Sequence, residues 1–165
     1  MEIFDALGFL LGSWRVQRHI EDRQIGISGA FKGVATFVQH KGCGASSLER
    51  KLRFHETGEL DFGTFSGHSE RCLEYIQHEG TQVRIYFASG RPFIDLDLSG
   101  GRSRSTHLCD LDTYEISFLA RSDDVLEENW QVQGPMKNYV ATATLRREVK
   151  SIPPEVAPSS GDFQF

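Results

Sequence analysis

Residues 9–16 read FLLGSWRV: three apolar residues, a glycine and a serine lead into Trp14. From there Trp14, Val16, Arg18 and Ile20 occupy every second position, and three of the four are apolar. A repeat of two residues places alternate side chains on opposite faces of an extended chain, which is typical of a half-buried β-strand. Residues 2–8, just before this stretch, have a short helical pattern. The stretch therefore predicts a short helix that leads directly into the first strand of a β-protein.

The same alternation recurs along most of the chain. Turn-forming segments rich in Gly, Asp, Ser and Pro separate about ten such runs at intervals of roughly ten residues. This spacing is typical of an antiparallel barrel or sandwich, and closure into a barrel leaves no free strand edges. The residues that share a face within each run are Trp14, Val16, Arg18, Ile20; Phe31, Gly33, Ala35, Phe37; Leu48, Arg50, Leu52, Phe54; Val83, Ile85, Phe87; Tyr114, Ile116, Phe118, Ala120; Leu126, Glu128, Trp130, Val132; and Tyr139, Ala141, Ala143, Leu145.

Length and composition indicate one globular domain. The chain has 165 residues and a formal net charge of −5 with both signs interleaved, so nucleic acid and anionic membranes are not expected as partners. No apolar run approaches the ~18 residues of a membrane span, and the acidic start does not resemble a secretory signal. Cys43, Cys72 and Cys109 are odd in number and widely spaced, which favours free thiols and a cytoplasmic location.

The GSWR segment has the G-x-W arrangement of the first strand of lipocalin-like (calycin) barrels, which the chain resembles. The resemblance implies that the helix plugs one barrel end, that Trp14 seals it, and that Arg146 or Arg147 of the last strand covers the indole. Such a contact stabilises by about 0.5–2 kcal/mol. We therefore predict an all-β, lipocalin-like antiparallel barrel of about ten strands over residues 1–149, with Phe9, Leu10 and Leu11 as the plug and a flexible C-terminal tail over residues 150–165.

Two family resemblances follow from longer motifs. Over about residues 5–148, the segments FLLGSWRVQRHIED, GAFKGVATF, GRPFIDLDL, HLCDLDTY and WQVQGPMKNYVATATLRR resemble an uncharacterised lipocalin-like family of unknown function. LLGSWR and the last strand resemble nitrobindin, a ten-stranded haem barrel. Where nitrobindin carries P-x-x-x-H this chain has PMKNY, so Tyr139 replaces the haem-ligating His, and tyrosine can also hold haem iron.

Several small residues lie on the predicted inward faces. Gly33, Ala35, Ala141 and Ala143 occupy positions where a large apolar side chain would fill a core. They either leave room for a ligand or accommodate large aromatic side chains from across the barrel.

The best candidate for a binding site is the segment around the last predicted turn. Gly134 and Pro135 form the turn, Lys137 follows at the rim, and Tyr139 is the first inward residue of the last strand. With Trp130 across the turn, these side chains offer a phenol, an ammonium and an indole N–H to an anionic or carbonyl-bearing molecule. The alternative is rim packing, since Trp and Tyr are often half-buried with nothing bound.

Two further segments carry polar residues. Asp95 and Asp97 share one face of FIDLDL; if that face points outward they are solvated, and if inward they form a carboxylate pair for acid/base work. The alternation then places Phe93 on their face. In HLCDLDTY, His107 and Cys109 share a face and Tyr114 follows, which makes His107 a candidate acid or base or a residue bonded to a neighbouring loop. The spacing of His and Cys residues predicts no metal site.

These observations lead to one functional hypothesis and its rivals. We expect a small-molecule-binding barrel that uses no cofactor and acts as a cyclase or isomerase on a hydrophobic or carbonyl-bearing molecule, with Tyr139, His107 and Lys137 catalytic. Trp130, Asp95, Asp97, Cys109 and Tyr114 are the predicted ligand-binding residues. A carrier or sensor without catalysis and a haem barrel remain the alternatives, and the oligomeric state stays open, a homodimer included. Arg15, Arg18, Arg50, Arg71 and Arg84 are candidate cavity cations, and a buried Arg would favour a carboxylate or phosphate ligand.

Overall fold

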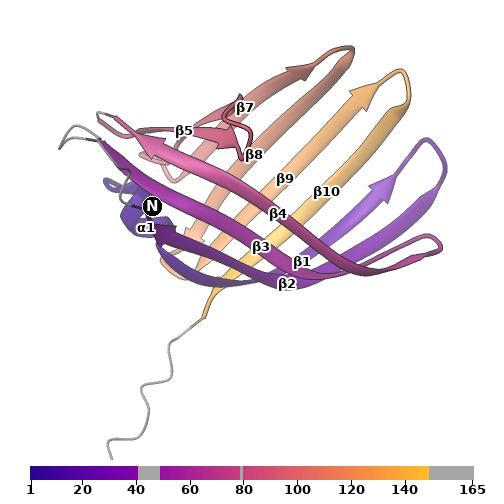
Figure 1. Cartoon of the computed structure of the whole chain (residues 1–165), viewed down its shortest axis with the longest axis horizontal. Coiled ribbons are helices and arrows are strands. Elements are labelled where there is room, and N and C mark those ends of the chain that lie inside the picture. Colours follow the sequence, from indigo (N-terminus) through magenta and orange to yellow (C-terminus); the bar gives the residue numbers. More distant parts are fainter. Residues whose placement is uncertain (41–48, 79, 149–165) are drawn as a thin grey trace, which may run out of the picture.

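The computed structural model describes residues 1–40, 49–78 and 80–148. Within them, one short helix and ten antiparallel strands form a nearly closed barrel, which confirms the predicted fold (Figure 1). The predicted tail, Leu48 and Cys43 lie outside the described residues. The elements are α1 (Ala6–Leu10), β1 (Gly12–Asp22), β2 (Ile27–Gln39), β3 (Arg50–Phe62), β4 (Phe65–Gln77), β5 (Gln82–Phe87), β6 (Pro92–Asp97), β7 (Arg102–Cys109), β8 (Asp112–Ser122), β9 (Val125–Gly134) and β10 (Lys137–Arg147).

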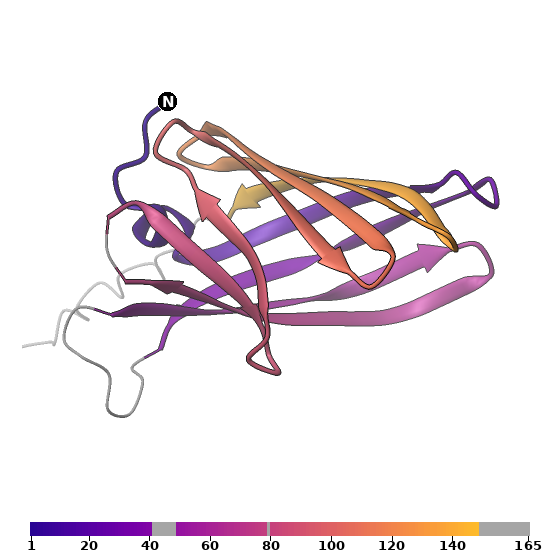
Figure 2. The ribbon, with the colours of Figure 1, turned by 90° about the horizontal axis from the view of Figure 1, so that it is seen from above.

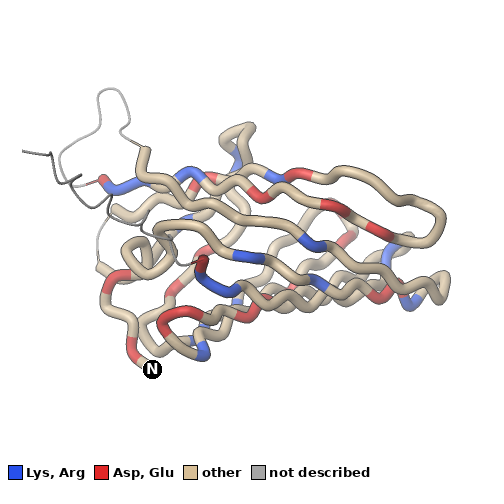
Figure 3. The backbone as a smooth tube through the Cα atoms, turned by 90° about the horizontal axis from the view of Figure 1, so that it is seen from below, with Lys and Arg blue, Asp and Glu red and all other residues tan. Residues whose placement is uncertain are grey.

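The two ends of the barrel differ. The turns of the β1–β2, β3–β4, β7–β8 and β9–β10 hairpins lie at the end away from α1 (Figures 1 and 2). We call this the hairpin end, and the other the helix end. Acidic and basic residues are interleaved along the strands, as the sequence predicts (Figure 3). The described residues contain no helix with the length and hydropathy of a membrane span.

The sheet closes at a seam between β6 and β7. The strand order is β6-β5-β4-β3-β2-β1-β10-β9-β8-β7, so these two strands are its edges. Serine side chains bridge them: the Ser105 hydroxyl donates to the Asp95 carbonyl, and the Asp97 N–H donates to Ser103 Oγ at 3.1 Å. Side-chain hydrogen bonds thus occupy backbone groups that would otherwise be an exposed strand edge.

The helix begins later than the sequence predicts. We expect helix over residues 2–8, but α1 starts at Ala6 because the Asp5 side chain accepts a hydrogen bond from the Gly8 N–H at 2.9 Å and caps the first turn. Its buried face consists of Ala6, Leu7 and Leu10. Leu11, predicted as part of the plug, is exposed because the chain has already left the helix there.

Trp14 seals the helix end as predicted. Its side chain is fully buried, and its indole Nε1–H donates to the Leu10 carbonyl at 2.8 Å. The Arg147 guanidinium lies 4.1 Å from the indole ring centre and donates to the carbonyls of Phe9 and Leu11. Of the two predicted covering residues, Arg147 is therefore the one in place, and one cation joins the last strand, the indole and the helix.

The small inward residues have two different roles. Gly33 and Gly58 face each other across β2 and β3, and the Phe31 ring lies 2.7 and 2.8 Å from where their Cβ atoms would stand. These glycines therefore make room for an aromatic ring of the barrel itself. Ala143 packs in the core, whereas Ala141 borders a cavity at the hairpin end.

An irregularity explains the position of Phe93. The pairing of β5 with β6 shifts between Ile85 and Tyr86, so that Phe93 is an extra residue on β6. Such a bulge breaks the strict alternation of sides. Phe93 and Ile94 are both buried in consequence, although alternation would turn one of them outward with Asp95.

Candidate functional site

A cavity of about 340 Å³ lies inside the barrel near its hairpin end. Ile20, Leu60 and Tyr139 in its wall stand close to the turns of three hairpins. The full lining combines apolar and charged side chains from β1, β2, β3, β4, β9 and β10: Arg18, Ile20, Phe31, Glu56, Leu60, Ser69, Glu70, Arg71, Trp130, Tyr139 and Ala141. Its volume lies at the lower end of those typical of small-molecule sites.

Two arginines and two glutamates form an interior ionic cluster against this cavity. Arg18 donates two hydrogen bonds of 2.8 Å to the two carboxylate oxygens of Glu56 and a third of 3.3 Å to Glu128. Arg71 lies farther away, with its Nη2 3.5 Å from Glu56 and 3.7 Å from Glu128. Arg18 is thus the tightly bound cation, and Arg71 is the loosely held one.

Pairing keeps the Arg18–Glu56 pair charged despite its burial. Burial alone would raise the pKa of the Glu56 carboxyl, but the hydrogen bonds from Arg18 and the charge of Arg71 outweigh it and hold the pKa below its ordinary value. Burial likewise lowers the pKa of Arg18, and the two glutamates more than reverse the effect. Glu56 is therefore an ionised acceptor at neutral pH and a weak proton acceptor for catalysis.

One N–H of Arg71 and the indole N–H of Trp130 have no hydrogen-bond partner among the described residues. Arg71 Nε and Trp130 Nε1 are the buried side-chain polar atoms without a hydrogen-bond partner in the described residues. Arg71 Nε lies 3.5 Å from a Glu56 carboxylate oxygen, an ion-pair distance at which it makes no hydrogen bond. The Arg71 guanidinium lies between two rings, 5.2 Å from the centre of Phe54 and 5.1 Å from that of Trp130. Buried donors normally have partners, so this pair indicates a place for an acceptor supplied from outside the chain.

Arg71 also separates the cavity from the core. It borders a void of about 10 Å³ on the side of the helix end, together with Tyr75 and Glu128. Burial, and secondarily the Glu128 charge, raises the pKa of the Tyr75 hydroxyl, which therefore stays neutral. Arg71 thus lies between the cavity and the core.

Two of the predicted site residues line the cavity. Trp130 and Tyr139 stand in its wall at the end next to the Pro135 turn, where the sequence predicts the mouth. Burial raises the pKa of the Tyr139 phenol, so that it remains a neutral hydroxyl able to donate a hydrogen bond. The catalytic and haem-ligating roles expected for Tyr139 both stay predictions.

Lys137 and Tyr114 pair with each other at the rim. Lys137 Nζ lies 2.6 Å from the Asp112 carboxylate and donates to the Tyr114 hydroxyl at 2.9 Å. The Asp112 carboxylate, followed by Tyr114, raises the pKa of Lys137 and keeps it an ammonium ion. Its pairing makes Lys137 a structural tie between β8 and β10 in this structure.

His107 lies in an aromatic cluster beside the seam. Its ring centre is 5.1 Å from that of Phe93 and 5.9 Å from that of Tyr114, and Phe93 reaches Trp130 at 5.6 Å. Through these rings His107 adjoins the cavity wall without lining the cavity itself. His107 instead borders, with Cys109, a separate hollow of about 380 Å³ at the seam.

The remaining predicted residues lie away from the cavity. Asp95 is exposed and its carboxylate pairs with Arg84 Nε at 2.8 Å, which is the solvated alternative of the two that the sequence leaves open. Asp97 accepts a hydrogen bond from the Ser99 N–H at 2.9 Å, which lowers its pKa. Cys109 is an exposed free thiol, as is Cys72.

The interior glutamates are the functional candidates that the sequence reasoning missed. Glu56 continues the inward face of Leu52 and Phe54, and Glu128 lies between Leu126 and Trp130 on another. A charged residue on an otherwise apolar face is the signal that could have identified them. Arg18 and Arg71 were two of five candidate cations, and only the structure separates them from the exposed ones.

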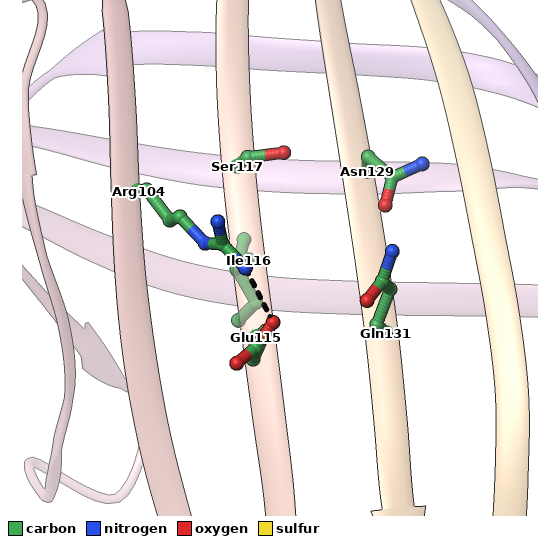
Figure 4. Close-up of a pocket in the computed structure, with 6 residues that line it drawn as sticks. All are labelled: Arg104, Glu115, Ile116, Ser117, Asn129 and Gln131. Carbon is green, nitrogen blue, oxygen red and sulfur yellow. Dashed lines mark hydrogen bonds and ion pairs between the residues drawn. The ribbon is translucent and has the colours of Figure 1, made fainter.

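A polar hollow on the outer surface contrasts with the interior cavity. It measures about 350 Å³ and lies over β7, β8 and β9, where Figure 4 shows Arg104 beside Glu115 with Ser117, Asn129 and Gln131 nearby. Arg104 donates to Glu115 at 2.6 Å, so its main cation is already paired. Among the described residues, no group of three His, Cys, Asp or Glu side chains stands close enough to hold a metal ion.

A family model establishes the family of this chain, and one solved structure supports the fold. The model of a family described as "Family of unknown function (DUF6314)" matches residues 10–147. The S-type phycobiliprotein lyase CPES from Guillardia theta superposes with a TM-score of 0.67 at 11% identity, covering 87% of this chain and 90% of that one. A de novo designed fluorescence-activating β-barrel has a TM-score of 0.44 at 13% identity, covering 88% of this chain and 100% of that one. No curated protein sequence matches the chain.

Proposed function

Because the chain belongs to the DUF6314 family, whose description assigns no chemistry, we propose a function from the site itself: the barrel binds a small, partly apolar molecule. The ligand enters at the hairpin end and lies in the cavity, where it accepts hydrogen bonds from Arg71 and Trp130. The observation that carries this proposal is the pair of buried N–H groups without partners in the wall of a cavity of about 340 Å³. An unpaired buried donor costs about 1–3 kcal/mol, which a bound acceptor would recover.

Binding without catalysis fits the charges in the site best. General acid/base work needs a group that can give or take a proton near the working pH. Glu56 is held ionised by Arg18, and Lys137 is held protonated by Asp112, so neither meets this need. We therefore place the carrier or sensor role ahead of the cyclase or isomerase role.

The catalytic role has one observation in its favour. Tyr139 lines the cavity as a neutral phenol and could stabilise negative charge that develops on a carbonyl oxygen. If the barrel is a cyclase or isomerase, Tyr139→Phe lowers turnover of a substrate identified by mass spectrometry of purified protein more than about tenfold, which corresponds to about 1.4 kcal/mol. Unchanged turnover in a folded variant would remove Tyr139 from the mechanism.

A pair of neighbouring substitutions tests the binding proposal. Ala141 borders the cavity, whereas the next residue, Thr142, is exposed on the outer face of β10. Calorimetric titration with three naphthalene probes (uncharged acetylnaphthalene, anionic naphthoate and cationic naphthylmethylammonium) should detect binding of at least one of them. Ala141→Leu should weaken that binding at least about tenfold by filling the cavity, and Thr142→Leu should leave it unchanged. The proposal fails if no probe binds, or if Ala141→Leu binds as tightly as the wild type.

A further inference from the structure

We infer that the ligand of the cavity is an uncharged molecule that presents a carbonyl-type acceptor to Arg71 and Trp130, although two arginines line the site. This inference rests on the proposed function and narrows its ligand class. A cavity with two guanidinium groups would ordinarily suggest a carboxylate or phosphate ligand. The charge balance and the unpartnered hydrogen-bond donors of this cavity instead favour an uncharged ligand.

The charges of the interior ionic cluster already cancel. Glu56 and Glu128 each lie within 3.7 Å of both Arg18 and Arg71, so two positive and two negative charges share one site. The remaining charged residue of the lining, Glu70, is exposed and pairs with His55 at 3.3 Å. An anionic ligand would therefore bring a third negative charge beside two buried carboxylates, and a cationic ligand a third positive charge beside two guanidinium groups.

The unsatisfied groups of the site are donors. Arg71 Nε and the indole Nε1 of Trp130 can only donate, and the neutral Tyr139 hydroxyl in the same wall can donate as well. A ligand that satisfies them has to supply acceptor atoms. An ammonium group supplies none, whereas a ketone, amide or quinone oxygen has two lone pairs and no charge to desolvate.

The rest of the lining suits a flat, apolar body. Phe31, Leu60 and Ala141 form the apolar wall, and the Arg71 guanidinium carbon lies over the Trp130 ring, 5.1 Å from its centre. Flat groups stack favourably on such surfaces. An aryl or conjugated carbonyl compound therefore matches the wall with its rings and the donors with its oxygen.

The three naphthalene probes separate this inference from the proposed function. On the wild-type protein, acetylnaphthalene should bind at least about tenfold more tightly than naphthoate and naphthylmethylammonium. Naphthoate or naphthylmethylammonium binding as tightly as the ketone would overturn the inference while leaving the proposed function standing. Binding of none of the three would refute the proposed function and the inference together.

Two substitutions locate the contacts. Trp130→Phe keeps an aromatic ring but removes the N–H, and should weaken acetylnaphthalene binding about tenfold. Glu128→Gln removes one interior negative charge, and should narrow the preference for the ketone over naphthoate at least about tenfold. Glu127→Gln, the neighbouring residue that pairs with Arg121 outside, should leave both affinities unchanged. Circular dichroism verifies that each variant is folded, and unchanged ketone affinity in folded Trp130→Phe would contradict the assigned contact.

Discussion

Removing Arg18 should destabilise the barrel more than any exposed substitution. Arg18→Met keeps most of the side-chain volume but removes two hydrogen bonds of 2.8 Å to Glu56 and one of 3.3 Å to Glu128. The two carboxylates have side chains only 4% and 7% exposed, and Arg71 reaches them no closer than 3.5 Å. Breaking a buried ion pair by removing one partner typically costs about 3–5 kcal/mol, and we expect a loss in that range from the free energy of unfolding.

Adding Glu56→Leu to Arg18→Met completes a double-mutant cycle, which distinguishes the cost of an unpaired charge from the cost of lost packing. In Arg18→Met/Glu56→Leu the carboxylate that Arg18 holds most tightly is absent as well, while Glu128 stays beside Arg71. Replacement of a buried pair by apolar residues is often neutral or stabilising. The double variant should therefore be more stable than Arg18→Met alone. Urea unfolding at pH 7, followed by circular dichroism, measures all members of the cycle. Arg18→Met within about 1 kcal/mol of the wild type, or a double variant no more stable than the single, would refute the reasoning.

The pH dependence of this difference follows from the lowered pKa of Glu56. A carboxyl with a lower pKa in the folded than in the unfolded state stabilises the fold above its unfolded value, about 4.3 for Glu. The contribution is lost as the pH falls through the folded pKa. The gap in stability between wild type and Arg18→Met should accordingly be full at pH 7 and shrink in acid, as Glu56 becomes protonated. A gap that stays constant down to pH 3 would show that the ion pair is not its source.

Three further substitutions test the closure of the barrel. Arg147→Met should lower the free energy of unfolding by about 2–4 kcal/mol, because it loses the indole contact and the hydrogen bonds to the carbonyls of Phe9 and Leu11. Arg146→Met, at the exposed neighbouring residue, should change the free energy of unfolding by no more than about 0.5 kcal/mol. Equal urea midpoints for the two variants would disprove the sealing role of Arg147. Gly58→Ala should lower the free energy of unfolding by about 1–3 kcal/mol, because the added Cβ would meet a backbone carbonyl of the opposite strand. A melting temperature equal to that of the wild type would contradict this contact. Ser103→Ala/Ser105→Ala should speed hydrogen exchange of the β6 amides about tenfold with little effect on β1, and uniform protection would mean that the seam does not depend on the serines.

The sequence predicted the overall fold correctly and failed where a single residue interrupts a local pattern. The inward faces follow the period of two along β1, β8, β9 and β10, because each strand there alternates between core and solvent. The period fails at Phe93, where a single extra residue in β6 turns two consecutive side chains inward. It also says nothing about where a helix begins, which the side chain of Asp5 decides through one hydrogen bond.

Some residues of the candidate site were likewise predictable from the sequence, and others were not. Trp130 and Tyr139 were predictable because they share a turn and an inward face, both of which are local properties. Lys137 was predicted from the same turn, but its charge is taken up by Asp112 of a different hairpin. Pairing partners from another strand depend on the register between strands, which a single sequence does not state.

The sequence alone predicted about ten alternating antiparallel strands, because alternation and turn spacing are properties of neighbouring residues. The tryptophan-sealed barrel end was expected from the resemblance of GSWR to lipocalin-like barrels. The tertiary structure decided the character of the interior, since Arg18 meets Glu56 and Glu128 across 38 and 110 residues of sequence. Electrostatic pairing depends on distance in space and on burial, and both arise only when the strands have taken their register. Four charged side chains on separate strands thus became one neutral cluster, beside which Arg71 Nε and Trp130 Nε1 have no hydrogen-bond partner in the described residues.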